Sequence, residues 1–222
     1  IRDYKARLAQ VDLSLIYNTL NALQDTPFVI NREMLVVCKA IMDSGGGLGL
    51  PRTEPEAMLP KLLEPYTEAE LKEHKKKQVA IIKRDTARKS KTLRLMATIA
   101  AAERFKDYDK IYFPWNIDYR GRCYPIPNSL SPQGDDVAKA LLLFADPTPC
   151  QNDEDIKWLA IHGANQAGQD KITLEERVAW IREHEEQIIH SAEDPLGFTW
   201  WYDISQNDYP LEFLAFCQEW KK

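Results

Sequence analysis

The feature that most constrains the fold is one long helix that the sequence predicts from Thr67 onward. Thr67-Glu68-Ala69-Glu70 is a capping box, which begins helices because its threonine and its second glutamate satisfy free backbone N–H groups. The helix is expected to continue to about Lys106, which is unusually long for a globular domain. A chain built around such a helix must cover it or let part of it project into solvent.

The apolar pattern of this helix is interrupted in its middle. Seven apolar residues form one stripe: Leu71, Val79, Ile82, Leu93, Met96, Ala97 and Ala100. The stripe lapses over 83–92, so this part is expected to project into solvent or to lie against something charged. Oppositely charged i,i+4 pairs would each stabilise the helix by about 0.3–0.5 kcal/mol. The pairs are Glu68/Lys72, Glu73/Lys77 and Asp85/Lys89.

Charge is distributed unevenly along the chain. The 29 Lys and Arg residues against 34 Asp and Glu residues give a net charge of −5, which alone argues against a nucleic-acid partner. Residues 72–94 nevertheless hold ten basic residues: Lys72, Lys75, Lys76, Lys77, Lys83, Arg84, Arg88, Lys89, Lys91 and Arg94. A basic stripe on an acidic body can follow a phosphate backbone. The alternative is a solvated helix face, and both readings stay open.

The rest of the chain predicts mostly helices, so the expected fold class is mostly α with a small β component (α+β). Further helices are expected over 3–24, from an Asn31 cap to the glycine run 45–49, over 136–145 behind an Asp135 cap, from an Asn152 cap, from the Thr173 capping box to about Ala192, and from Asp208-Pro210 to Trp220. The glycine run is interpreted as a flexible linker. Gly163 inside its helix indicates close packing against a neighbour.

One short buried strand is expected at Ile111-Tyr112-Phe113, with Pro114 and Asn116 stopping regular pairing after it. The Trp200-Trp201 pair is expected to pack in a core or at a domain edge.

The stretch after this strand carries the main candidate binding residues. Asp118, Tyr119, Arg120, Gly121 and Arg122 follow one another. A glycine between two arginines lets the backbone approach a ligand closely, and each arginine fork can grip a phosphate with two hydrogen bonds. The tyrosine offers a flat face to a base or ribose, and the aspartate can hold an arginine in position. The alternative is a surface turn with solvated arginines.

These residues also belong to a family resemblance. Asp118-x-x-Gly121-Arg122 after Phe113-Pro114-x-Asn116 resembles the single-subunit DNA-directed RNA polymerases of phages and mitochondria, the phage branch more closely. The likeness is collinear over nearly the whole chain. It includes Gln24-Asp25-Thr26-Pro27, Arg84-Asp85-x-Ala87-Arg88-Lys89-Ser90, Pro132-Gln133-Gly134-Asp135-Asp136, residues 158–165, Asp170-Lys171, Trp200-Trp201 and residues 213–217.

The resemblance implies a domain order and a role. It implies the end of an N-terminal domain over 1–50, a linker over 51–66, a helical thumb over 67–107 and the first part of a polymerase palm over 108–222. The segment would hold the template–RNA hybrid of a DNA-directed RNA polymerase. The rival reading, from another class, is a non-catalytic helical module that binds nucleic acid or an acidic protein. A hydrolase using Asp and His groups is a third possibility.

The resemblance also implies particular site residues. Nucleic-acid contacts are implied for Arg122, Arg120, Tyr119, Asp118, Lys139, Arg88, Lys89, Lys91 and Arg94. Lys171 would lie near the triphosphate of the incoming nucleotide, or it is simply a charge at a helix C-terminus. No catalytic or metal-binding residue is assigned, because Asp118 reads as a positioning group and Asp170 as a solvated turn residue.

The expected cofactor is Mg²⁺, held by aspartates of family motifs that this chain stops short of. The expected partners are a DNA template, an RNA transcript, nucleoside triphosphates and the remaining polymerase segment or a second subunit. The chain alone is therefore expected to be inactive. The absence of an initiating methionine suggests an excised piece or a processed chain.

Other features point to the cytoplasm, that of a host cell if the protein is phage-encoded. No apolar run approaches the length of a bilayer crossing, and no signal-peptide pattern is present, so no membrane partner is expected. The four cysteines are far apart and form no Cys-x-x-Cys, which indicates reduced thiols of an intracellular protein.

Overall fold

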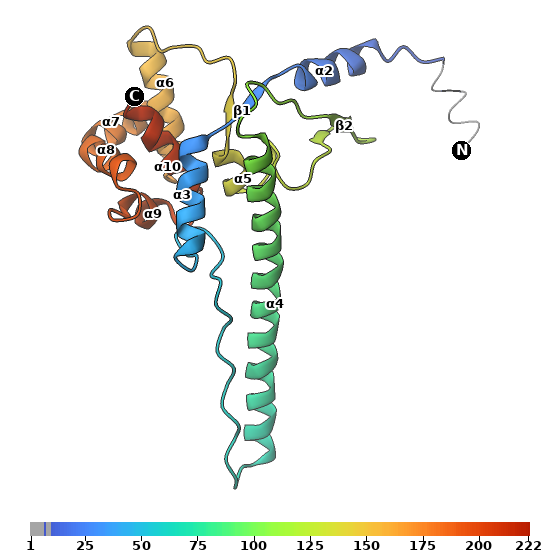
Figure 1. Ribbon diagram of the computed structural model, residues 1–222, viewed down its shortest axis with the longest axis vertical. Coiled ribbons are helices and arrows are strands. Elements are labelled where there is room, and N and C mark those ends of the chain that lie inside the picture. Colours follow the sequence, from blue (N-terminus) through green and yellow to red (C-terminus); the bar gives the residue numbers. More distant parts are fainter. Residues whose placement is uncertain (1–6, 8–9) are drawn as a thin grey trace.

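The computed structural model describes residue 7 and residues 10–222, and it shows a mostly helical protein with small antiparallel sheets (Figure 1). Its helices in this range include α2 (Ser14–Gln24), α3 (Arg32–Asp43), α4 (Glu68–Phe105), α5 (Asp136–Ala140), α6 (Asp153–Gln166), α7 (Leu174–Glu183), α8 (Glu185–Glu193), α9 (Trp200–Ser205) and α10 (Pro210–Trp220). Its strands are β1 (Phe28–Ile30), β2 (Trp115–Ile117), β3 (Cys123–Pro125) and β4 (Leu142–Phe144). The predicted fold class is confirmed.

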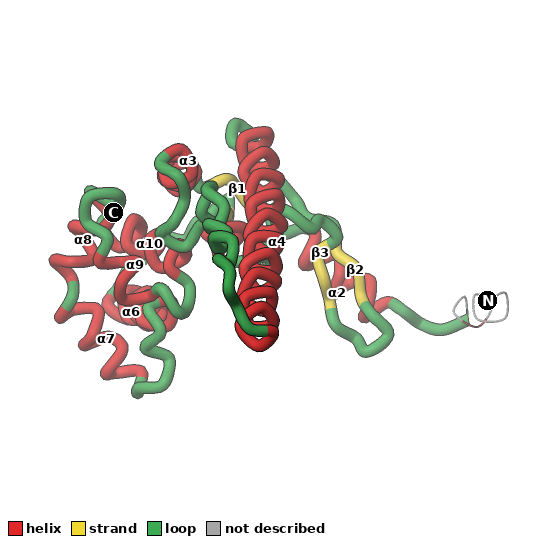
Figure 2. The backbone as a smooth tube through the Cα atoms, turned by 90° about the horizontal axis from the view of Figure 1, so that it is seen from below, coloured by secondary structure: helices red, strands yellow, loops and turns green. Residues whose placement is uncertain are grey.

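Helix α4 projects from the rest of the protein as a long arm (Figure 1). Its predicted start is confirmed, because Thr67 and Glu70 satisfy each other's backbone N–H groups in a capping box. Residues 51–66 run back along the arm without regular structure. Seen along α4, the cluster α6–α10 lies on one side and the β2–β3 hairpin with α2 lies on the other (Figure 2).

The core lies where α3, α5 and the inner end of α4 meet the cluster α6–α10. Helix α10 is central to it, since it packs against α5, α6, α8 and α9 and buries Leu211, Phe213 and Leu214 completely. Gly163 of α6 lies against the Phe216 ring, where a Cβ atom would collide, so the predicted close packing is confirmed. Trp201 is also fully buried, as expected for a core residue.

Helix α10 takes its N-terminal cap from another helix. The carboxylate of Asp136 in α5 accepts hydrogen bonds from the N–H groups of Leu211 at 3.0 Å and Glu212 at 2.8 Å. The predicted final helix is confirmed, but the residue at its own N-cap position, Tyr209, provides no side-chain cap. Burial raises the pKa of Asp136 to about 6, although the two N–H groups act in the opposite direction.

The strand predicted at 111–113 is wrong in position. Ile111 makes one bridge with Phe28 and forms no strand with its neighbours. Pro114 and Asn116 do not stop pairing, because Asn116 lies inside β2 opposite Tyr124 of β3. The second sheet joins β1 to β4, which are far apart in the sequence. Three-residue strands depend on such partners, and a local pattern does not reveal them.

Two predicted helices are shorter than expected. The helix predicted over 136–145 ends at Ala140, because the N–H of Asn31 donates to the carbonyl of Leu141 and residues 142–144 pair with β1. The helix expected from Thr173 to about Ala192 is interrupted at His184, whose backbone has φ −105° and ψ 17°. The His184 ring stacks on Trp180, with 4.4 Å between the ring centroids.

Of the N-terminal helix predicted over 3–24, the described residues show helix at Arg7 and from Ser14 to Gln24, with residues 10–13 outside it; residues 1–6 and 8–9 are not described. Asp12 accepts hydrogen bonds from the N–H and the hydroxyl of Ser14, a local arrangement that competes with helix. The glycine run ends α3 as predicted. It forms a turn in which Gly47 and Leu50 exchange backbone hydrogen bonds, and not an unstructured linker.

The apolar stripe predicted for α4 lies on the wrong side of the helix. Val79, Ile82, Leu93 and Met96 are 47–68% exposed. The covered face instead carries the buried residues Ile81, Leu95, Thr98, Ile99 and Ala102. The prediction failed because the covered face of the outer arm also holds polar residues, which bond to the backbone of the segment beside it.

The cap of α10 gives a first prediction. Asp136→Ala should lower the free energy of unfolding by about 1–2 kcal/mol, because two N–H groups lose their acceptor. Urea unfolding followed by circular dichroism measures it. The matched control is Asp208→Ala, which removes the residue expected from sequence to begin α10 and should cost less than about 0.5 kcal/mol. An equal decrease in the free energy of unfolding in both variants would contradict the cap that Asp136 of α5 provides.

The same carboxyl gives a second prediction, on pH. Its pKa rises from the ordinary value of 3.8 to about 6 in the folded protein, so the folded state holds the proton more tightly. This contribution to stability is present below the ordinary pKa and is lost as the pH rises through the folded value, by at most about 3 kcal/mol.

We therefore expect the stability of the wild type relative to Asp136→Asn to fall between about pH 4 and pH 7 in urea unfolding. Lys106 and Lys39 lower the pKa of Glu103 to about 2, so Glu103 changes the stability with pH in the opposite direction. Because both proteins contain Glu103, its effect cancels when their stabilities are subtracted. A difference that does not vary with pH would count against the prediction.

Candidate nucleic-acid interface

The β2–β3 hairpin presents the candidate arginines at its tip. Asp118 and Arg122 close the turn with a backbone hydrogen bond of 2.9 Å, and the N–H of Gly121 donates to the carbonyl of Asp118 at 3.0 Å. Gly121 has a φ of +81°, a conformation that side-chain-bearing residues rarely adopt. The turn therefore depends on a glycine at this position.

Asp118 organises the tip from inside. One carboxylate oxygen accepts from the N–H groups of Arg120 at 2.8 Å and Arg122 at 3.0 Å. The other oxygen accepts from two nitrogens of the Arg120 guanidinium, each at 3.2 Å. The backbone N–H of Arg122, followed by that of Arg120, holds the pKa of Asp118 below its ordinary value. The carboxylate therefore stays ionised and orients Arg120.

The other residues of the tip face solvent. Tyr119 is 94% exposed, and the Arg120 guanidinium lies 5.4 Å from the centroid of its ring. Arg122 is exposed, and within the described chain its guanidinium makes no ion pair. A planar ring and two cations on a tight turn can together contact a base and its phosphates.

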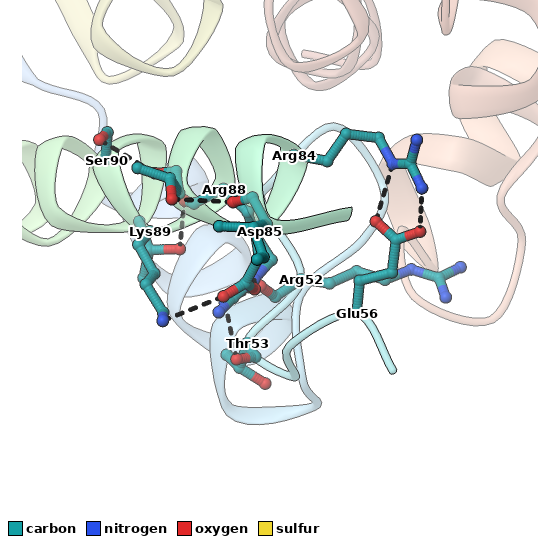
Figure 3. A network of polar contacts seen from close by, with 11 residues as sticks. Arg52, Thr53, Glu56, Arg84, Asp85, Arg88, Lys89 and Ser90 are labelled. Carbon is teal, nitrogen blue, oxygen red and sulfur yellow. Dashed lines mark hydrogen bonds and ion pairs between the residues drawn. The ribbon is translucent and has the colours of Figure 1, made fainter. Parts of the chain in front are cut away.

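The four candidate residues of α4 differ from one another. Arg88 donates to Asp85 at 2.8 Å and to the carbonyls of Arg52 at 3.0 Å and Thr53 at 2.8 Å (Figure 3). It is therefore occupied within the protein. Lys89 is exposed and pairs with Asp85 at 3.0 Å.

Lys91 and Arg94 border an open cavity between α4 and α5. The cavity measures about 500 Å³, and its wall on the α5 side includes Asp135 and Asp136. Both carboxylates are already used as helix caps, Asp135 on α5 and Asp136 on α10. Lys91 and Arg94 are exposed and form no ion pair among the described residues, so these two cations can take an external anion.

Lys139 of α5 is occupied by a neighbour. Its ammonium lies 3.2 Å from Glu212 of α10 and 5.0 Å from the centroid of the Tyr209 ring, and its side chain is 35% exposed. A phosphate at Lys139 would compete with Glu212. Glu212 is a residue that sequence reasoning missed, because only tertiary packing brings the start of α10 to α5.

Lys171 lies in the turn between α6 and α7 and is exposed. The Asp170 side chain beside it is also exposed, while its backbone carbonyl accepts a hydrogen bond from Arg177. This placement agrees with Asp170 as a turn residue.

The structure does not gather these candidates into one pocket. The hairpin lies on the opposite side of α4 from the cluster that includes Lys171 (Figures 1 and 2). Helix α4, which carries Lys89, Lys91 and Arg94, lies between them. The candidates therefore form separate positively charged groups spread over the protein, which suits an extended polyanion better than a small ligand.

A metal fits poorly among these groups. Over residue 7 and residues 10–222, no three His, Cys, Asp or Glu side chains stand close enough to hold an ion together. Asp118 and Asp136 are both committed to N–H groups, so neither is arranged as a metal ligand. Among the described helices, none combines the length and the apolar character that a bilayer crossing requires.

The hairpin gives a third prediction. Asp118→Ala should speed amide hydrogen exchange at Arg120 and Arg122 by about tenfold, because their N–H groups lose the shared acceptor. Exchange followed by nuclear magnetic resonance measures it. The matched control is Asp109→Ala, an exposed aspartate for which no side-chain hydrogen bond occurs in the described chain. Unchanged exchange at both amides would show that Asp118 does not order the tip.

Comparison with known proteins relates this chain to RNA polymerases. The family model described as DNA-dependent RNA polymerase matches residues 150–222. The chain is 38% identical over 217 residues to the DNA-directed RNA polymerase of Enterobacteria phage T3, covering 96% of this chain and 24% of the relative. It is 36% identical over 218 residues to T7 RNA polymerase of Escherichia phage T7, covering 96% and 24%.

The mitochondrial DNA-directed RNA polymerase 1B of Nicotiana tabacum is 33% identical over 219 residues, which cover 97% of this chain and 22% of that protein. The chain thus spans about a quarter of the length of the curated relatives it matches. Its match to the phage proteins is the stronger, as the sequence predicted. The chain is therefore a homologue of one segment of the phage-type, single-subunit DNA-directed RNA polymerases.

Proposed function

We propose that this chain is the part of a DNA-directed RNA polymerase that holds the template–RNA hybrid during template-directed nucleotidyl transfer. The observation that carries the proposal is the likeness to polymerases over almost the entire chain, together with the exposed Arg122 on an ordered turn. In this proposal the thumb is 67–107, the first part of the palm is 108–222, the linker is 51–66 and residues 1–50 end an N-terminal domain.

Most of the binding residues in the proposal are open to solvent. Arg122, Arg120 and Tyr119 contact the hybrid from the hairpin, and Asp118 positions them. Lys89, Lys91 and Arg94 contact phosphates from the arm. Lys139 takes part by exchanging Glu212 for a phosphate, and Lys171 lies near the triphosphate of the incoming nucleotide. Arg88 is left out of these contacts because its Nε and Nη1 already donate within the protein and its side chain is only 18% exposed.

The catalytic part of the proposal lies outside these residues. Nucleotidyl transfer needs Mg²⁺ held by carboxylates, and the described residues contain no suitable group. The remaining polymerase segment or a second subunit would supply it, acting on the DNA template, the transcript and nucleoside triphosphates. The setting is the cytoplasm of the host cell if the protein is phage-encoded.

Salt-dependent binding of an RNA–DNA hybrid tests the proposal. We expect the logarithm of the affinity to fall linearly with the logarithm of salt concentration, because phosphate contacts release counterions. Arg122→Ala should weaken binding roughly tenfold and make this slope shallower by about one. Fluorescence anisotropy with a labelled hybrid measures both quantities.

The matched control is Arg182→Ala, an exposed arginine at the end of α7 in the helical cluster, which should change neither quantity. If the wild-type chain does not bind the hybrid at low salt, the proposal is wrong. If both variants lose the same affinity, binding reflects only general charge attraction. In the complete polymerase, Arg122→Ala should slow elongation while the fold persists. Normal elongation would favour a binding module without a catalytic role.

A further inference from the structure

The segment beside α4 is bound to it by polar contacts at several levels. We call residues 51–66 the strap. Glu56 of the strap forms a two-pronged ion pair with Arg84, at 2.8 Å and 2.5 Å. The carbonyl of Pro60 lies 2.8 Å from a ring nitrogen of His74. The start of the strap is also tied to the glycine turn, because the N–H of Thr53 donates to the carbonyl of Gly45 at 2.9 Å.

The Arg88 side chain is less exposed than the Arg84–Glu56 pair, and its bond to Asp85 is partly buried, whereas its bonds to the strap carbonyls are exposed. Its Nε donates to Asp85, while its Nη1 donates to the carbonyls of Arg52 and Thr53 (Figure 3). The side chains of Arg88 and Asp85 are only 18% and 15% exposed, whereas those of Arg84 and Glu56 are 60% and 42% exposed. Charged hydrogen bonds shielded from solvent are weakened less by salt than exposed pairs.

The contacts follow one face of the helix. His74, Ile81, Arg88, Leu95 and Ala102 stand seven positions apart, which places them in one line along α4. Leu95 and Ala102 belong to the main core. Ile81 is buried although it lies outside that core, between His74 and Arg84, both of which contact the strap. One face of α4 thus continues from the core onto the strap.

We propose that Arg88, held by Asp85, is a positioning residue that clasps the strap to α4 and thereby sets the direction of the cationic arm. This inference rests on the proposed function, because it is the hybrid-binding residues Lys89, Lys91 and Arg94 that the clasp would orient. Among the described elements, no second helix packs against the part of α4 that extends beyond the core. The strap is its support there, and Arg88 joins the helix to two strap carbonyls, those of Arg52 and Thr53.

Arginine chemistry makes the clasp specific. The guanidinium bonds one carboxylate and two carbonyls at once because its donors lie in a fixed planar fork. A lysine keeps the charge but has a single ammonium, which cannot reproduce this fork geometry. Arg88→Lys therefore separates loss of the clasp from loss of charge.

The experiment measures strap mobility and hybrid binding on the same variants. In Arg88→Ala and Arg88→Lys, the Thr53 amide, whose N–H donates to the carbonyl of Gly45, should exchange about tenfold faster. Glu56→Gln should speed exchange at Thr53 to a smaller extent, because its pair is exposed. Lys75→Ala, on the far side of the helix, is the control and should leave strap exchange unchanged.

Hybrid binding then distinguishes positioning from direct contact. A positioning role predicts weaker affinity by several-fold in both Arg88 variants with an unchanged salt slope, since no phosphate contact is lost. The proposal is overturned if strap exchange stays at the wild-type rate. It is also overturned if Arg88→Ala lowers the slope by about one and Arg88→Lys restores it, because Arg88 would then be a phosphate contact.

Failure of the proposed function gives a different result. If the wild-type chain binds no hybrid at low salt, the hybrid-holding role falls. The exchange rate at Thr53 still decides whether Arg88 clasps the strap, because it is measured without nucleic acid.

Discussion

The rest of the fold depends on one carboxylate that joins two helices. Asp136 of α5 binds the first free N–H groups of α10, and α10 is the helix against which α5, α6, α8 and α9 pack. This contact sets where the helical cluster begins relative to β4 and α4. It does so with a buried charge whose pKa is raised to about 6, so the position of α10 is obtained at an electrostatic cost.

The arm follows a different physical rule. Its inner end is held by apolar packing through Leu95, Ile99 and Ala102, whereas its outer part is joined to the strap by ion pairs and bonds to backbone carbonyls. Polar contacts on this face leave much of the remaining surface of α4 in solvent, where its other basic residues lie. A long basic helix with an apolar root and a polar support can reach along a nucleic-acid backbone without burying its charges.

The hairpin and the arm offer cations in different ways. At the hairpin tip, Asp118 orders the backbone of both arginines and leaves Arg122 open. On the arm, Asp85 forms ion pairs with both Arg88 and Lys89. A cation's position in the sequence therefore does not tell whether it is available. The charged groups around it decide that, which is why the site is best described by the free cations rather than by the basic run as a whole.

Local signals determined much of this protein. The capping boxes at Thr67 and Thr173, the Asn31, Asp135 and Asn152 caps and the long helix were readable because caps and their targets lie within a few residues. The motif over 118–122 could also be recognised from neighbouring residues. The family likeness came from several such motifs in the same order along the chain.

Tertiary structure alone decided the β1–β4 pairing, the cap from Asp136, the break at His184 and the occupation of Arg88 and Lys139. Each of these depends on groups brought together by folding or on packing around a side chain. A residue's own neighbours in the sequence carry no record of such contacts.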